Sequence, residues 1–164
     1  MFVYYFDHIG KPLEVVAQGL CRLSQPDLAD LVGQAYELGE AMRTRVSVAN
    51  GFKLSKELEV RLGPPVEVVD GVVLPIHVRA TGPASLFPRL EADIELTGLG
   101  PELTQLSLRG SYKPPMAFVG EAIDRLLLHR VAEAAVKALV EQLCAAFAQG
   151  PVGGRVAPPE GPQS

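Results

Sequence analysis

Apolar residues recur at every third or fourth position in two stretches near the N-terminus. Leu13, Val16, Ala17 and Leu20 form the first set, and this spacing places them on one face of a helix. Residues 24–27 then supply an N-cap and an early proline for a second helix of the same period, which runs to Leu38. Before both, residues 2–6 are rich in aromatic residues and valine, a composition that favours a strand. The sequence therefore begins with one predicted strand followed by two predicted helices.

After Met42 the apolar period changes from about 3.6 to two, which is typical of strands with one dry face. Glycine and proline break the pattern at residues 63–65, 70–71, 82–83 and 98–101. Strands joined by such short segments can only be antiparallel neighbours. The pattern predicts a meander whose dry face needs a cover. Its inner positions are Leu58, Val60, Leu62, Val72, Leu74, Ile76, Val78, Leu90, Ala92, Ile94, Leu96, Leu106, Leu108 and Tyr112.

The cover is predicted to be one long helix over residues 117–149, which contain no proline and only Gly120 as a glycine. Its charges form a ladder at a spacing of four, in which the favourable acid-first pairs are Glu121 with Arg125 and Glu133 with Lys137. Most of the remaining circumference is apolar. The predicted fold class is therefore α+β: an antiparallel meander sheet wrapped around a long C-terminal helix, with two short helices after the first strand.

Length and composition fit one folded domain over residues 1–149. The chain has 164 residues, of which 48% are apolar, enough for a single core. Residues 150–164 are rich in proline and glycine and have no apolar periodicity, so we expect a disordered tail. No apolar stretch reaches the length of a membrane span, and the N-terminal residues do not resemble a signal peptide. A soluble cytoplasmic protein is expected.

Charge and residue spacing argue against several classes of function. The net charge is −4 and the pI is near 5.4, so a basic surface for nucleic acid is not expected. Cys21 and Cys144 lie far apart in apolar helical segments and are interpreted as buried reduced thiols. Neither a metal-ligating cluster nor a phosphate-binding glycine loop is found. We expect no cofactor and no metal.

The histidines do not form an evident catalytic pair. Asp7 and His8 are adjacent in a strand, so their side chains point to opposite faces. Asp124 and His129 are five residues apart on the helix, where they are poorly placed to touch, and His77 belongs to the polar side of its strand. These residues are interpreted as solvated, and the chain is not expected to be an enzyme, although the question stays open.

Three residues near the ends of predicted strands are candidates for a role at a ligand site. Tyr112 shares the dry face with Leu108, so its hydroxyl needs a partner there. It either anchors the end of the sheet or orients a ligand. Arg89 and Glu91 flank the start of a strand and are placed at a solvated edge or at a cavity mouth.

The junction between the last strand and the long helix resembles that of a known superfamily. Residues 108–115 (LRGSYKPP) followed by residues 120–133 (GEAIDRLLLHRVAE) look like this junction in bacterial members of the START-like or SRPBCC superfamily, which has the helix-grip fold of the birch-pollen allergen. The order of elements is similar over nearly the whole chain. The resemblance implies an apolar ligand between sheet and helix. Some members are polyketide cyclases, lipid carriers or coenzyme-binding proteins.

The leading functional hypothesis is a binding module for a small apolar molecule or lipid. Two alternatives stay open: an enzyme of the cyclase, dehydratase or hydrolase type, and a structural or partner-binding protein with a filled core. An interior volume of several hundred Å³ would favour ligand binding. The sequence does not decide the identity of the ligand or whether the chain forms a homodimer. The predicted ligand-binding residues are Leu74, Ile76, Ile94, Leu108, Tyr112, Ile123 and Leu127.

Overall fold

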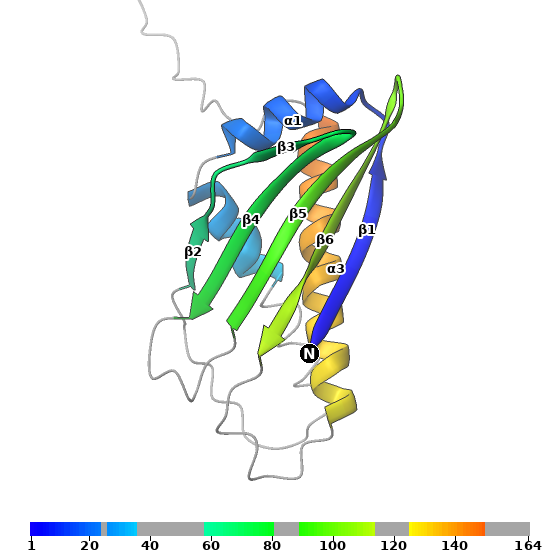
Figure 1. Ribbon diagram of the computed structural model, residues 1–164. Helices are drawn as coiled ribbons and strands as arrows, with labels where there is room; N and C mark the ends of the chain where they lie inside the picture. Colours follow the sequence, from blue (N-terminus) through cyan, green and yellow to red (C-terminus); the bar gives the residue numbers. More distant parts are fainter. Residues whose placement is uncertain (24–25, 36–57, 81–88, 114–124, 150–164) are drawn as a thin grey trace, which may run out of the picture.

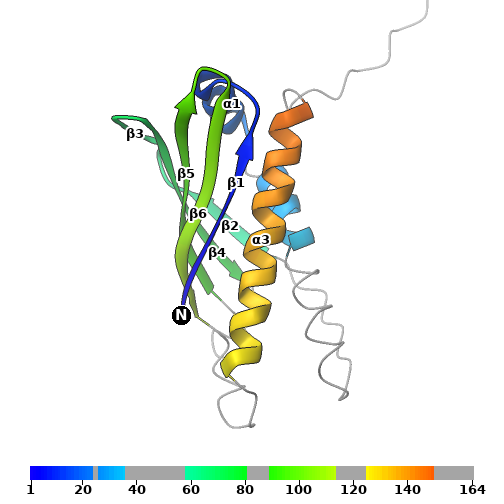
Figure 2. The same ribbon diagram turned by 90° about the vertical axis from the view of Figure 1, so that its right-hand side faces the viewer.

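The computed structural model describes residues 1–23, 26–35, 58–80, 89–113 and 125–149 of the chain. They form an antiparallel sheet with helices on one of its sides, which confirms the predicted α+β class (Figures 1 and 2). Residues 26–35 are helical as well. The remaining elements are β1 (Phe2–Ile9), α1 (Leu13–Arg22), β2 (Leu58–Leu62), β3 (Val66–Val68), β4 (Gly71–Ala80), β5 (Arg89–Gly100), β6 (Leu103–Lys113) and α3 (Arg125–Gln149).

The sheet is a meander that the first strand extends at one edge. Its order is β1-β6-β5-β4-β2, with β3 paired to β4 beside this path. β1 pairs with β6 from Phe2 opposite Ser111 to Ile9 opposite Thr104. The Met1 ammonium nitrogen donates to the Tyr112 carbonyl oxygen at 2.8 Å, and the Tyr112 backbone nitrogen donates to the Met1 carbonyl oxygen at 2.8 Å. The start of the chain is thereby tied to the end of the last described strand.

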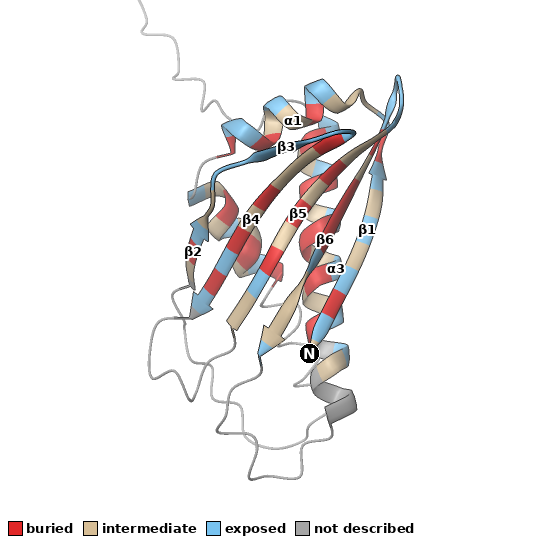
Figure 3. Ribbon diagram, viewed as in Figure 1, coloured by how far each residue is buried: buried red, intermediate tan, exposed pale blue. Residues whose placement is uncertain are grey.

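The alternation of apolar and polar residues places the core on the helix side of the sheet. Buried residues alternate with less buried ones along β4 and β5 (Figure 3). Ile76, Ile94 and Leu108 are fully buried at the centre of the inner face, as their parity predicts. Val16 and Leu20 of α1 are buried too. The predicted division into a dry and a wet face is confirmed along most of β4 and β5, whereas in β6 Ser107 of the predicted wet face is buried as well.

α3 lies along the inner face, against β1 and β6 (Figure 2). Its 25 described residues correspond to a length of about 37 Å at 1.5 Å per residue. Near the C-terminal end of α3, the Lys11 ammonium donates to the Phe147 carbonyl oxygen at 2.9 Å. A cation is favourable there, because the last carbonyl groups of a helix lack partners within it. The buried residues of α3 are Ala132, Val136, Leu139, Val140, Leu143, Cys144 and Phe147.

Several boundaries of helices and strands differ from the sequence prediction. β3 was not predicted, because its three residues are exposed and show no alternation. β5 continues to Gly100, beyond the predicted break at residue 98, with an irregular register between Gly98 and Gly100. The predicted start of the long helix at residue 117 and the predicted tail over residues 150–164 lie outside the described residues.

In the described part of α3 the polar ladder makes contacts that are shifted by one step, and Glu121 of the predicted pair with Arg125 lies outside the described residues. His129 Nε2 lies 3.0 Å from a carboxylate oxygen of Glu133, and Lys137 Nζ lies 3.7 Å from one of Glu141. Glu133 therefore pairs with the residue before it in the ladder, where we predicted a pair with Lys137. Lys137 Nζ also lies 5.9 Å from the centre of the Tyr5 ring, within reach of a cation–π contact.

Candidate functional site

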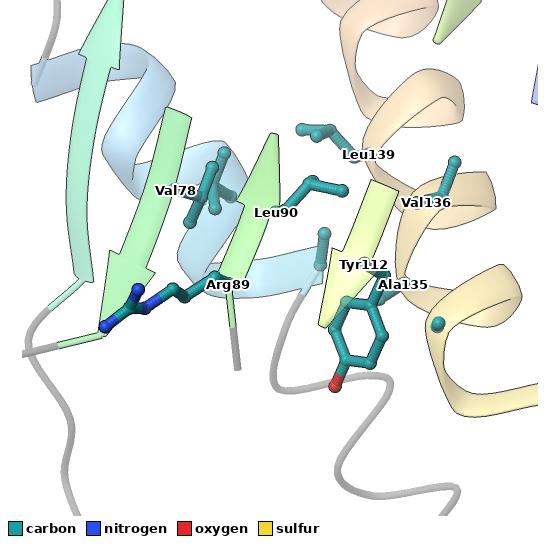
Figure 4. A pocket seen from close by; sticks show the side chains of 10 residues that line it. Val78, Arg89, Leu90, Tyr112, Ala135, Val136 and Leu139 are labelled. Carbon is teal, nitrogen blue, oxygen red and sulfur yellow. The ribbon is translucent and has the colours of Figure 1, made fainter. Parts of the chain in front are cut away.

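A cavity of about 60 Å³ lies between the sheet, α3 and the helix of residues 26–35. It is found near the ends of β4 and β6 and the start of β5 (Figure 4). One water molecule needs roughly 10–15 Å³ in this measure, so the cavity holds several water-sized groups. Its lining residues are Val32, Ala35, Val78, Arg89, Leu90, Tyr112, Ala132, Ala135, Val136 and Leu139.

The wall of the cavity is almost entirely aliphatic. Eight of the ten lining residues are alanine, valine or leucine. The other two are Arg89 and Tyr112. The Arg89 guanidinium extends toward the end of β4, and the Tyr112 hydroxyl points away from Leu90 and Leu139 (Figure 4). The polar atoms of both residues therefore lie at the rim, and the arrangement favours contact with an apolar group inside.

Of the residues predicted to bind a ligand, the structure places Tyr112 on the cavity wall. Leu74, Ile76, Ile94 and Leu108 are buried in the core, where they fill the inner face of the sheet and do not line the cavity. Ile123 and the side chain of Leu127 lie outside the described residues. A role of these seven residues in binding stays a prediction.

Sequence reasoning considered Arg89 for a cavity mouth but did not find the other lining residues, although most were already placed on apolar faces. Ala132, Ala135 and Val136 come from α3, and Val32 and Ala35 come from the helix of residues 26–35. The available signal was the clustering of small side chains on two helices. That signal alone does not show where the two helices face each other across empty space.

The two residues flanking Leu90 lie on different surfaces. Arg89 contributes to the cavity rim. Glu91 belongs to a hollow on the outer face of the sheet, with a volume of about 270 Å³. This hollow is also lined by Phe2, Pro75, His77, Ala92, Asp93, Arg109 and Gly110. One of its charged groups, the Arg109 guanidinium, forms an ion pair with Glu95 at a nitrogen–oxygen distance of 2.5 Å.

The candidate acid–base residues are placed as the sequence predicted. Asp7 is partly buried on the inner side of β1 and His8 is exposed. Asp7 Oδ1 accepts a hydrogen bond from the His8 backbone nitrogen at 2.8 Å, and the His8 ring meets the Phe6 ring edge-on at 5.6 Å. His77 is exposed, opposite Arg61 and Glu91 in the register. The cavity lining does not include Asp7, His8 or His77.

The two cysteines are free, and one of them corrects the sequence interpretation. Cys144 is buried as expected, but Cys21 is exposed, because it lies on the outer side of α1, away from the face of Val16 and Leu20. Burial, together with the negative charges of Asp7 and Glu141, raises the pKa of the Cys144 thiol from 9.0 to about 12. Cys144 is therefore an unreactive thiol within the core.

Within the described parts of the chain, no group of three or more histidine, cysteine, aspartate or glutamate residues could hold a metal ion. In the same parts, no helix combines the length and the apolar character that a membrane span requires.

The overall architecture has counterparts among solved structures. The conserved protein from Geobacillus kaustophilus superposes with a TM-score of 0.52 at 16% sequence identity, over 89% of this chain and 94% of that chain. The chain adopts a helix-grip-like fold. At this identity the likeness shows the fold alone. No protein-family model matches the chain, and no curated protein matches it.

Two further solved structures are similar at lower scores. A hypothetical protein from Helicobacter pylori has a TM-score of 0.45 at 9% identity, over 87% of each chain. An aromatase/cyclase from a Streptomyces species has a TM-score of 0.36 at 14% identity, over 90% of this chain and 93% of that chain. Neither score supports an argument about the chemistry of this chain.

Proposed function

We propose that this protein binds a small apolar molecule, or the apolar end of a lipid, in the cavity between the sheet and α3. The observation that carries this proposal is the wall of eight aliphatic side chains around a cavity of about 60 Å³. Ligand pockets are predominantly apolar, with a few polar groups that fix orientation. Arg89 and Tyr112 at the rim match that composition.

The size of the cavity limits the ligand. Sixty Å³ is well below the several hundred Å³ that would favour ligand binding over a filled core, so the proposal rests on the composition of the wall and not on its volume. The buried part of the ligand is therefore short, with the bulk of a few carbon atoms, and any remainder extends past the rim. A short acyl chain or a single ring fits this limit better than a multi-ring polyketide.

Binding without catalysis is the simpler use of this wall. Catalysis requires polar groups aimed at the charge that develops in the transition state. Arg89 and Tyr112 direct their polar atoms away from the aliphatic wall (Figure 4). We infer a cytoplasmic binding protein of the START-like type, in which the apolar ligand is held and not transformed.

Binding of 4-(dimethylamino)benzonitrile, a neutral single-ring dye whose emission rises in apolar surroundings, tests this proposal. The wild-type protein is expected to bind about one dye per chain and to release it when 1-hexanol is added. Ala135→Phe places a ring in the cavity and is expected to reduce dye affinity at least tenfold, because the new side chain occupies the site. Ala135 is only partly buried, so the larger side chain need not disrupt the core.

Ala145→Phe is the matched control, because Ala145 lies on the exposed side of the same helix. This variant is expected to bind the dye as the wild type does. Circular dichroism and thermal unfolding confirm that both variants fold. No dye binding to the wild type, or equal binding by folded Ala135→Phe, would contradict the proposal.

A further inference from the structure

Three cationic side chains form a row across neighbouring strands at the end of the sheet where the cavity lies. Arg79 of β4 is opposite Arg89 of β5, and Arg89 is opposite Lys113 of β6. Residues directly opposite each other have Cβ atoms about 4.5–5.5 Å apart, and like charges in such positions are destabilising. A row of three cations therefore has an electrostatic cost that an anion placed between them would relieve.

The described carboxylates nearest to the row in the register do not pair with it: Glu91 lies on the same face, diagonal to Arg79 and Lys113, but forms no ion pair with either of them. Glu59 is opposite Arg79 in the register, but its carboxylate lies 2.6 Å from the guanidinium of Arg61. Among the residues that the structure describes, no carboxylate forms an ion pair with Arg79, Arg89 or Lys113. Arg79 and Lys113 are exposed, so their charged groups are accessible to a ligand.

Each cation of the row is a chain neighbour of a cavity wall residue. Val78 precedes Arg79, Leu90 follows Arg89 and Tyr112 precedes Lys113, and these three neighbours all line the cavity. Successive strand residues point to opposite faces, but Arg89 begins β5, Lys113 ends β6 and Arg79 is the last but one residue of β4. Long side chains there can pass around the end of the sheet. Arg89 does so in part, since it also lines the cavity (Figure 4).

We propose that the ligand is an anionic amphiphile, whose carboxylate or phosphate head is held by Arg79, Arg89 and Lys113 while its short apolar body enters the cavity. This inference rests on the proposed function and adds the chemical class of the ligand. Arg89 connects the two parts of the site, because its aliphatic stem contributes to the wall and its guanidinium reaches the rim. The other two cations determine that the head is negative.

Displacement of 4-(dimethylamino)benzonitrile by hexanoate, hexyl phosphate, 1-hexanol and inorganic phosphate tests this proposal. Hexanoate or hexyl phosphate is expected to displace the dye at a lower concentration than hexanol, and the better of the two identifies the head. Inorganic phosphate is expected not to displace it, because it lacks an apolar body. The advantage of the anions is expected to shrink as the salt concentration rises, because the head is exposed.

Arg89→Gln and Arg79→Gln are expected to raise the required hexanoate concentration about threefold to fivefold each, as for one partly exposed ion pair. The hexanol displacement of Arg79→Gln is expected to stay unchanged, because Arg79 does not line the cavity. Arg22→Gln is the matched control: it removes the same charge from the exposed end of α1, where Arg22 neither belongs to the row nor lines the cavity, and it is expected to leave hexanoate displacement unchanged.

The outcomes separate the two proposals. If hexanol displaces the dye as well as hexanoate does, or if Arg89→Gln and Arg79→Gln leave hexanoate displacement unchanged, the anionic head is wrong while apolar binding stands. If the dye does not bind to the wild type, both proposals are wrong. The melting temperature of Arg89→Gln without ligand is expected to equal or exceed that of the wild type, because the variant relieves repulsion within the row. A loss of hexanoate binding is then not a loss of folding.

Discussion

Three alanines from two helices, Ala35, Ala132 and Ala135, line the cavity opposite Leu90 and Val78 of the sheet. A methyl side chain at these positions leaves space that leucine or valine would occupy. Elsewhere on the inner face, large residues such as Ile76 and Ile94 are fully buried and close the core. The cavity is therefore located by the small side chains of the helices and not by any special residue of the strands.

The two thiols are expected to differ strongly in reactivity, since thiolate is the reactive form and the pKa of the Cys144 thiol is raised to about 12 by burial and by Asp7 and Glu141. At pH 8, Ellman's reagent should modify only the exposed Cys21 of the folded protein and both thiols after unfolding in urea. Cys21→Ser should leave no rapidly reacting thiol. Rapid modification of two thiols in the folded protein would contradict the buried position of Cys144.

The raised pKa of the Cys144 thiol also makes the stability of the protein depend on pH, in a direction that follows from the shift. Its pKa in the folded protein is above its ordinary value of 9.0, so unfolding releases a proton between about pH 9 and pH 12. The contribution of Cys144 to stability is complete below pH 9 and is lost as the pH rises through this window.

At the residue scale, the sequence predicted which face of the sheet a residue occupies, but it predicted the residues that line the cavity less well. Tyr112 was placed on the inner face by its parity with Leu108, and the structure has it on the cavity wall. Leu74 and Ile94 were predicted from the same parity, but they lie within the core. Parity shows which side of a sheet a residue faces. It does not show whether a helix side chain fills the space above that residue.

At the element scale, α3 provides the largest apolar surface that covers the sheet. Leu143 is fully buried on it, at a position where α3 lies against the inner face. Leu143→Ala is expected to lower the free energy of unfolding by roughly 2–5 kcal/mol, as for other buried leucines. Urea unfolding followed by circular dichroism measures this change.

Glu141→Ala is the control for that measurement, because Glu141 is exposed on the same helix and pairs only loosely with Lys137. Its effect is expected to stay within about 0.5 kcal/mol. A loss below about 1 kcal/mol for Leu143→Ala would show that α3 does not pack against the sheet at this point.

The elements that were predicted from the sequence are those with a strong period. β4, β5, β6 and α1 are close to their predicted ranges because each has three or more apolar residues in one periodic pattern. β3 has three exposed residues and is held by pairing with β4, a long-range contact that no local pattern shows. The position of β1 beside β6 is also a long-range property, since it depends on which edge of the meander is free.

At the scale of the whole molecule, the sheet and α3 lie against each other (Figure 1) and enclose one core. The cavity lies at one end of this core, near the ends of β4 and β6 (Figure 4). The central claim is that this end receives the apolar part of a ligand. The cationic row of Arg79, Arg89 and Lys113 lies at the same end. Apolar wall and charged rim are thus brought together by the strand ends, although their residues come from three strands and two helices.

The most direct test of this claim is a titration with hexanoate followed by methyl NMR. The expected shifts are centred on the cavity methyl groups of Val78, Leu90, Val136 and Leu139, and they saturate together at one affinity. The exposed methyl groups of Val15 and Leu99, far from the cavity lining, are expected to stay unchanged. Shifts confined to exposed methyl groups, or no saturable shift at the four cavity residues, would contradict the account.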